Sequence, residues 1–555
     1  MKNILKNILA ILEKREKKQF FSLMLLDIVV SIFDILFLAF LLVIVQFYIQ
    51  PGSAGKLFFL PDWLSDRSSV LLIAVFLLLF CIKNWFGYVV SRANFRLIDK
   101  VAIRISRTNL SNYQQAAFSE FVHRDSSEHI RNICFRPFEF SQYMLSGFQQ
   151  IITQLALIFL TIIAIILFNV KLFLLLLLLL LPPVIIVSWL IKKRIANTKK
   201  SIQENNELSI KYVLDALKGY VESNIYNRNG FFQSRFITAR KKFSKAVFDS
   251  LALQSLPGRI IEIFAVLGLF ILIVIATWSG NTDGSMLITI GAFMAAAYKI
   301  IPGIVKVINV SGQIKAYESS LEYLEENKEE KTKPVVDTLA EGLTSIELKN
   351  VSFKYNELPV LQHFSMTINK GDFIGITGES GKGKTTLLNL LLGFLPASGG
   401  DICFNNELVN SEGIKRYWPQ IAYVRQQQFF IHDTLLKNIT LEEDHHDARQ
   451  LHTALETSGL KNLVATFPEG LEKMITENGK NISGGQQQRI AIARSLYKKA
   501  DLILLDEPFN ELDEEATISM LEHFKELASK GRSVVMITHD KKSLSYCNKI
   551  ISLNE

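Results

Sequence analysis

The amino-acid sequence predicts an all-α membrane domain with six transmembrane helices, followed by a smaller α/β domain. Apolar residues concentrate in roughly the first 310 of the 555 positions, and short strand-like and helical patterns alternate after Ser345. The chain is 49% hydrophobic and only 21% charged, which is more apolar than a typical soluble protein of this size. Its four cysteines form no CxxC pair, which argues against a disulfide framework or a structural zinc site.

Six apolar segments account for the first domain. Each has about the 17–25 apolar residues that cross a bilayer core, the first being somewhat longer. One such segment could be a buried helix of a soluble fold, but six in one half of the chain argue against that interpretation. The expected spans are Phe20–Tyr48, Val70–Val90, Ile151–Phe168, Leu172–Leu190, Ile260–Trp278 and Met286–Val310.

The distribution of lysine and arginine predicts the orientation. Six of these cations precede the first span, eight lie in the connection Ser91–Gln150 and fourteen in Ile191–Arg259. The connections expected on the other side hold only Lys56, Arg67 and Lys171. Because positive segments stay cytoplasmic, we expect both termini and the second domain on the cytoplasmic side of the plasma (inner) membrane. Membrane-proximal cations also explain the net charge of +8, so we expect no nucleic-acid partner.

The two long cytoplasmic connections have apolar residues at helical spacing, such as Phe95, Ile98, Val101 and Ile105. We expect the transmembrane helices to continue into the cytoplasm there. Each connection would fold back through a short turn, near Tyr113–Glu120 and Lys218–Arg228.

A glycine-rich loop follows a short apolar strand in IGITGESGKGKTTLLNLLLG. Gly378, four further residues and then Gly383-Lys384-Thr385 match the P-loop pattern. The loop N–H groups can surround phosphates at a helix N-terminus, Lys384 adds a positive charge, and the Thr385 hydroxyl can reach Mg²⁺. The residues expected to bind the nucleotide are Gly378, Glu379, Ser380, Gly381, Lys382, Gly383, Lys384, Thr385 and Thr386.

A second candidate site begins where the apolar strand Leu502–Leu505 ends in Asp506-Glu507. In a parallel sheet, a carboxylate at the carboxyl end of a strand lies beside the P-loop and can bind Mg²⁺, which is the role expected for Asp506. Glu507 could polarise the attacking water. By itself, an apolar run that ends in Asp-Glu indicates only the end of a strand. Its occurrence in the same domain as a P-loop favours a functional site.

Between these motifs, Ser483-Gly484-Gly485-Gln486 in NISGGQQQRIAIARSLY resembles the signature of ATP-binding-cassette (ABC) proteins. Other landmarks follow in the order of that family. Tyr355 resembles the aromatic residue that stacks on adenine, Gln426 the Q-loop glutamine, Asn510–Asp513 the D-loop and His539 the switch histidine.

The resemblance implies an α/β P-loop NTPase (ABC cassette) domain at 345–555, a linker at 331–344 and a transmembrane domain at 1–330. One membrane domain followed by one cassette resembles an exporter-type half-transporter. The implied cofactors are ATP and Mg²⁺, with Gln426 also near the metal and His539 contacting the γ-phosphate. In this family the signature completes the ATP site of a second cassette, so the resemblance implies a dimer. Because both halves of the site look intact, a homodimer is expected.

Several positions depart from the common exporter pattern. Ile482 replaces a leucine, Arg425 replaces a frequent proline, and Pro508–Glu511 replaces the usual Ala-Thr-Ser-Ala. None of these changes removes a catalytic group. The D-loop change could alter communication between the two ATP sites.

The membrane domain carries charges within or beside its spans. Lys83, Arg259 and Lys299 are candidates for a cationic cavity wall that would bind an anionic headgroup, or they pair within the membrane. Asp27 and Asp34, seven residues apart, share one helical face of the first span. The segment AAYKIIPGIVKVINVSGQI also resembles bacterial flippases of lipid-linked oligosaccharides.

Three functions remain open for this architecture. The first is ATP-driven flipping or export of an amphipathic anionic substrate such as a membrane lipid. The second is export of a peptide or a hydrophobic compound. The third is a non-transporting ATPase regulator, which the six spans and two cytoplasmic turns disfavour.

Overall fold

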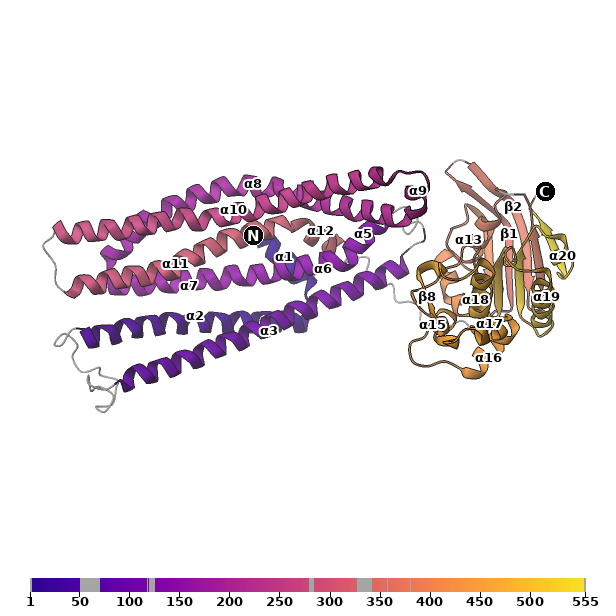
Figure 1. The fold of residues 1–555 in the computed structure, drawn as a ribbon, viewed down its shortest axis with the longest axis horizontal. Coiled ribbons are helices and arrows are strands. Elements are labelled where there is room, and N and C mark those ends of the chain that lie inside the picture. Colours follow the sequence, from indigo (N-terminus) through magenta and orange to yellow (C-terminus); the bar gives the residue numbers. More distant parts are fainter. Residues whose placement is uncertain are drawn as a thin grey trace. The chain divides into compact units, whose positions relative to one another are not determined.

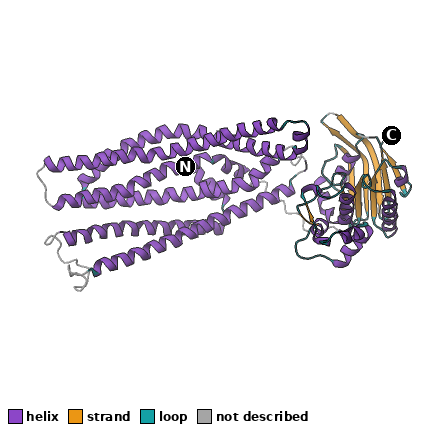
Figure 2. Ribbon diagram, viewed as in Figure 1, coloured by secondary structure: helices purple, strands orange, loops and turns teal. Residues whose placement is uncertain are grey.

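The computed structural model describes residues 2–49, 70–116, 118, 125–278, 284–326, 342–356, 358–379 and 381–553. Two compact units form: Met1–Ala116 with His123–Lys331, and Ala117–Val122 with Thr332–Glu555. The first unit is helical and the described strands belong to the second (Figures 1 and 2). Ser380, most of the expected linker at 331–344, and the loops with Lys56, Arg67 and Asn281 lie outside the described residues.

Long helices build the first unit. Its elements are α1 (Lys2–Ile11), α2 (Lys14–Ile49), α3 (Leu71–Gln115), α5 (Ser126–Ile130), the π-helical η2 (Arg131–Phe135), α6 (Arg136–Glu139), the π-helical η3 (Phe140–Leu145), α7 (Ser146–Phe168), α8 (Val170–Lys218), α9 (Tyr220–Ile225), α10 (Asn229–Trp278), α11 (Gly284–Ala316) and α12 (Glu318–Glu326).

The six predicted spans lie within α2, α3, α7, α8, α10 and α11. Five of the described helices are long and apolar enough to cross a membrane, and within α8 the described apolar segment is Leu176–Ile186. Large apolar side chains on these helices are exposed, among them Leu78, Leu178 and Trp278. Such a surface suits hydrocarbon rather than water. The predicted helical membrane domain is confirmed.

The helices extend well beyond the apolar segments, as predicted. The predicted span that starts at Val70 ends at Val90, yet α3 continues to Gln115. The short helix α9 lies in the predicted second turn. These extensions have their own core, in which Ile8 of α1, Val101 of α3 and Phe140 of η3 are fully buried. A bidentate ion pair between Arg104 and the buried Glu16 fastens α3 to α2.

Two main sheets build the second unit. The parallel sheet has the order β11-β3-β10-β9-β6, and the antiparallel sheet has the order β2-β1-β4-β5. The strands are β1 (Ser345–Tyr355), β2 (Leu358–Asn369), β3 (Phe373–Thr377), β4 (Gly399–Phe404), β5 (Glu407–Leu408), β6 (Ile421–Val424), β7 (Asp433–Thr434), β8 (Met474–Ile475), β9 (Leu502–Asp506), β10 (Ser533–Ile537) and β11 (Lys549–Ser552).

Helices and short 3-10 segments connect these strands. They are α13 (Lys384–Leu391), α14 (Ser411–Ile414), η4 (Lys415–Gln420), α15 (Leu435–Thr440), α16 (Ala448–Thr457), α17 (Leu460–Thr466), η5 (Gly470–Glu472), η6 (Glu477–Gly479), α18 (Gly484–Tyr497), α19 (Glu514–Ser529) and α20 (Lys541–Leu544).

The parallel sheet is covered on both faces, which explains why its strands are continuous apolar runs. In β9, Leu502 and Leu504 pack in the core that contains α13 and the antiparallel sheet. The intervening Ile503 and Leu505 pack in the core that contains α18 and α19. Every residue of β9 is therefore buried, and its last residue, Asp506, reaches the carboxyl edge of the sheet.

Candidate nucleotide-binding site

The carboxyl edge of the parallel sheet gathers most of the predicted site residues. The P-loop follows β3, His539 follows β10 by two residues, Asp506 ends β9, and Gln426 follows β6 by two residues. Because β3, β10, β9 and β6 are neighbours in that order, these side chains meet along one edge although up to 161 positions separate them.

The P-loop is shaped for a ligand with phosphate chemistry. Gly381 and Gly383 have φ values of +85° and +91°, which favour glycine, and a Cβ atom on Gly381 would meet nothing within 4 Å. Gly383 caps α13 and lies against Val360 of β2. The ammonium group of Lys384 donates to the carbonyls of Gly378 and Glu379, at 2.6 and 3.0 Å. A cation therefore occupies the inside of the loop.

The other P-loop residues differ in exposure. Thr385 and Glu379 are exposed, so the Thr385 hydroxyl is accessible to a metal ion, whereas Thr386 is buried.

Asp506 is a buried carboxylate with few compensating contacts. Its side chain lies 3.5 Å from the hydroxyl of Tyr423 on β6, and the residue is 6% exposed. Burial and then the neighbouring Glu507 carboxylate raise the pKa of Asp506, while Tyr423, Lys384 and Arg425 oppose this shift. A buried anion of this kind is stabilised by a bound cation.

Glu507 leaves the strand in a left-handed conformation, with φ +47°, which is rare for a non-glycine residue. Its N–H still donates to the Ile537 carbonyl of β10 at 3.0 Å, so the turn directly follows the sheet. One carboxylate oxygen, Oε2, accepts hydrogen bonds from Gln426 at 2.8 Å and from Asn510 at 2.9 Å. The other oxygen lies 4.0 Å from Nδ1 of His539. Glu507 is thereby joined to the Q-loop, the D-loop and the switch histidine.

The signature residues begin α18. Ser483 is the N-cap, and it forms a capping box with Gln486: its hydroxyl accepts from the Gln486 N–H at 3.3 Å, while the Gln486 side chain accepts from the Ser483 N–H at 3.2 Å. Gly484 and Gly485 lie against Glu511, where any Cβ atom would be 3.0 and 2.8 Å from Glu511 oxygens. The signature helix and the D-loop of one chain are thus packed together.

The remaining predicted residues lie outside this contact network. Tyr355 is 47% exposed at the end of β1, where its ring packs edge-on against Phe353. Asp513 caps α19 by accepting from the Ala516 N–H at 2.7 Å, and it lies 3.2 Å from Arg489 of α18. The predicted roles of the site residues stay predictions.

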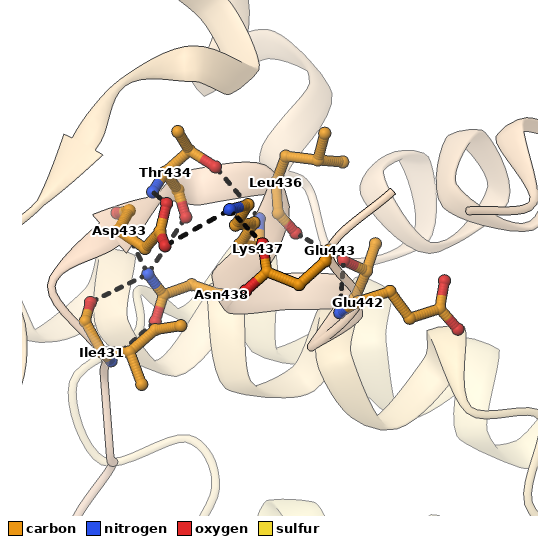
Figure 3. Close-up of polar contacts among 9 residues, drawn as sticks. Ile431, Asp433, Thr434, Leu436, Lys437, Asn438, Glu442 and Glu443 are labelled. Carbon is orange, nitrogen blue, oxygen red and sulfur yellow. Dashed lines mark hydrogen bonds and ion pairs between the residues drawn. The ribbon is translucent and has the colours of Figure 1, made fainter. Parts of the chain in front are cut away.

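The segment after Gln426 is shaped by a buried asparagine, Asn438. Its carboxamide donates to the carbonyls of Ile431, Asp433 and Thr434 at 3.0–3.3 Å and accepts from the Ile431 N–H at 3.0 Å (Figure 3). This segment borders a groove of about 880 Å³ whose wall includes Phe394. The ring of Phe118, from the predicted first turn, stacks on Phe394 with a centroid distance of 4.7 Å.

The candidate substrate cations separate into two groups. Lys83 of α3 and Lys299 of α11 both form ion pairs with Asp34 of α2, Lys299 at 3.4 Å. Arg259 is exposed and pairs with Glu262 at 3.8 Å. Asp27 lies in a separate network and accepts from Asn94 and Gln149, at 2.9 and 2.6 Å. Two of the three predicted cations thus share one carboxylate.

Three contributors to the site carry little signal in the sequence. Asn510 stands where the common exporter pattern has a small residue. The sequence shows this difference, but it does not show the hydrogen bond from Asn510 to Glu507. Tyr423 and Asn438 were not predicted. Each acts through a contact with a residue distant in sequence or with the backbone of a turn, which composition and spacing do not reveal.

The two units match two known domains in the same chain. Residues 20–297 match the ABC transporter transmembrane region, and residues 361–510 match the ABC transporter domain. The chain therefore belongs to the ABC transporter family, as the motifs predicted. It joins one membrane domain to one ATP-binding cassette, which is the arrangement of a half-transporter.

Curated relatives of this chain are 25–27% identical to it in sequence. The ATP-dependent lipid A-core flippases of Burkholderia orbicola and Neisseria meningitidis serogroup B are 27% and 26% identical over 66% of this chain. The alignments span 63% and 59% of these relatives, about three fifths of their length. The flippase of Polaromonas sp. is 25% identical over 86% of this chain and 81% of its own.

A solved structure confirms the fold. A bacterial Atm1-family ABC exporter with ATP bound superposes with a TM-score of 0.76 at 17% identity, covering 97% of this chain and 93% of its own.

The buried carboxylate leads to a stability prediction. Because the folded-state pKa of Asp506 is raised, its ionisation weakens folding as the pH rises through that pKa. We expect Asp506→Asn to raise the Tm of the nucleotide-free protein at pH 7.5, with a smaller difference at lower pH. The variant should also lose the additional stabilisation that Mg²⁺-ATP confers beyond ATP with EDTA. Calorimetry across about pH 4–8, starting near the ordinary pKa of an aspartate, tests this, and a lower Tm for the variant at pH 7.5 would contradict it.

Proposed function

We propose that this chain is an ATP-driven transporter that flips or exports an amphipathic, anionic lipid-linked substrate. The observation that carries the proposal is the assembly of the P-loop, Asp506, Glu507, Gln426 and His539 on one sheet edge, in a chain that also has a membrane domain. The names of the relatives, lipid A-core flippases, support a lipid substrate. The proposed location is the inner membrane, with the termini and the cassette cytoplasmic.

The cassette residues fit Mg²⁺-ATP. The P-loop has an open glycine cradle with a lysine inside it, and the donor set nearby consists of an exposed threonine hydroxyl and a buried carboxylate. Thr385, Asp506 and Gln426 would hold Mg²⁺, which supplies positive charge to the phosphates. Tyr355 would stack on adenine. Lys384 stabilises negative charge on the transferring group, and Glu507 orients the attacking water while His539 contacts the terminal phosphate.

The proposed working unit is a homodimer. Ser483, Gly484, Gly485 and Gln486 lie at the N-terminus of α18, where helix N–H groups favour a bound anion. In the proposed dimer they bind the ATP held by the P-loop of the second copy, together with Asp513. The apolar residues Tyr220, Val221 and Ile225 of α9, in the second cytoplasmic turn, are exposed.

Lys83 and Lys299 are the candidates for binding the anionic headgroup. With Asp34 they form a cluster of three charges with a net charge of +1, partly buried and shared by α2, α3 and α11. A phosphate group could take the place of Asp34 and would balance both lysines.

The pairing with Asp34 also favours a second function. A cluster whose charge is partly offset within the protein, together with an exposed Arg259 that pairs locally, suits an exporter of peptides or hydrophobic compounds.

The catalytic role of Glu507 predicts a loss of turnover without a loss of nucleotide binding. Glu507→Gln keeps the side-chain volume but removes the anionic oxygen that orients water, so we expect ATPase activity to fall about 100-fold or more. ATP should remain bound. Lys384→Ala is the matched comparison, because it should weaken nucleotide binding itself. Steady-state ATPase assays and nucleotide titration separate the two, and retained turnover in Glu507→Gln would refute the assignment.

The Asn510 contact predicts an effect specific to this D-loop. Asn510→Ser restores the small residue of the common pattern but cannot reach Glu507, so one of the two donors to Oε2 is lost. We expect kcat to fall about threefold to tenfold, the size of one typical hydrogen bond at an exposed site, with an unchanged KM for ATP. Asn510→Gln, which keeps the carboxamide, should retain more activity than Asn510→Ser. An equal loss in both variants would indicate a structural role only.

Substitution of the clustered lysines distinguishes the two proposed functions by its effect on lipid-stimulated ATPase activity. If Lys83 and Lys299 bind the headgroup, alanine at either position should raise the lipid concentration for half-maximal ATPase stimulation about tenfold, because one partner of a phosphate is lost. Lys245→Ala, an exposed lysine of α10, is the control. Polyprenyl pyrophosphates in nanodiscs are the test lipids. Unchanged stimulation in both lysine variants would leave these residues as partners of Asp34 and favour the alternative.

A further inference from the structure

A polar pocket lies inside the first unit, separate from the lysine cluster. Its volume is about 350 Å³, and η2, α6, η3, α8, α10, α11 and Tyr317 contribute to its wall. The wall is rich in carboxamides, and those lining it are Gln203, Asn206, Gln254, Asn309 and Gln313. A helix interface that only needed to be packed would favour apolar residues at these positions.

The geometry around the pocket shows unused hydrogen-bonding capacity. Asn309 donates to the Gln254 carbonyl at 2.9 Å, but its carbonyl oxygen, Oδ1, is buried without a partner among the described residues. Gln313 donates to the side chain of Gln254 at 3.2 Å. A buried acceptor without a donor is unfavourable unless a ligand or water supplies one.

Aromatic rings form another part of the wall. Tyr143 and Tyr317 stack with a centroid distance of 4.2 Å and an interplanar angle of 6°. Tyr143 belongs to the π-helical segment η3, and Arg131, also in the wall, belongs to η2. Such π-helical insertions change the direction of side chains within a long helix and are frequent at functional sites.

The charges of the wall balance each other. The charged lining residues are Arg131 and Glu139. Arg131 pairs with Glu207 at 2.8 Å, and Glu139 accepts from the Ser320 hydroxyl at 2.5 Å. Among the described residues of this wall, no cation is without a carboxylate partner, so the pocket does not suit the anionic part of a lipid.

Helix lengths place the pocket at one membrane surface. Asn309 lies 25 residues after the first residue of α11, and Gln254 lies 24 residues before the last residue of α10. At 1.5 Å per residue both are about 36–38 Å from the helix ends that face the opposite side in the proposed orientation. A hydrocarbon core is about 30 Å thick, so the pocket lies at the level of the cytoplasmic headgroups.

We propose that this pocket binds the uncharged sugar part of a lipid headgroup. Each carboxamide offers a donor and an acceptor, as each sugar hydroxyl does, and tyrosine rings pack against the C–H faces of sugar rings. The proposal rests on the lipid-transport function and adds the recognised group and its location. The anionic part of the lipid is then left to a different region of the membrane domain.

A matched pair of lipids tests the proposal. The probes are a polyprenyl pyrophosphate carrying an oligosaccharide and the same lipid without sugar, titrated against the full-length protein in nanodiscs by native mass spectrometry. Wild type should bind the glycosylated lipid more tightly. Asn206→Leu and Asn309→Leu should each weaken that binding about fivefold to tenfold, the effect of losing one buried hydrogen bond, without changing binding of the sugar-free lipid.

The controls separate recognition from folding. Asn205, next to Asn206, bonds to Ser201 within its own helix and is not part of the pocket wall, so Asn205→Leu should change neither affinity. Asn206→Gln retains a carboxamide and should stay within about twofold of wild type. The proposed sugar site would be overturned if wild type bound the two lipids with equal affinity. It would also be overturned if the pocket variants lost affinity for both lipids equally. Neither result would contradict lipid transport. Binding of neither lipid would overturn the lipid substrate as well.

Discussion

The cassette depends on the parallel pairing of β3, β10, β9 and β6. Parallel strands bring their carboxyl ends to the same edge, so loops from distant parts of the chain must meet there. The helices that cover both faces make the strands apolar throughout and leave Asp506 as the buried polar end of β9. The positions of the P-loop, Asp506 and Glu507 are consequences of this arrangement.

Glu507 connects two loops of the cassette that are far apart in the sequence. Its Oε2 atom is held by the Q-loop through Gln426 and by the D-loop through Asn510. The next D-loop residue, Glu511, packs on the signature glycines, and a Cβ atom on Gly485 would lie 2.8 Å from its backbone carbonyl oxygen. The signature, where the second copy is proposed to bind, is therefore connected to Glu507 through contacts of adjacent D-loop residues.

The sequence was most informative where a local pattern determines the structure. Long apolar runs predicted the membrane helices, and the strand–loop–helix pattern predicted the P-loop, because both depend on neighbouring residues. It was least informative for long-range pairing. Seven-residue spacing placed Asp27 and Asp34 on one helical face but did not show that Asp34 pairs with Lys83 and Lys299, or that Asp27 accepts from Gln149. Side chains such as Tyr423 and Asn438 acquire their roles only once strands and turns have assembled.

The central claim is that one chain holds half of each ATP site and a second copy completes it. Mixed dimers of two tagged chains test it, one with Lys384→Ala and one with Ser483→Arg. Each variant alone should fail to occlude ATP, because both of its sites carry a defect. In the mixed dimer both defects fall in one site, so the account predicts about one occluded ATP per dimer, half the wild-type value. No recovery in the mixed dimer would contradict a site shared between two chains.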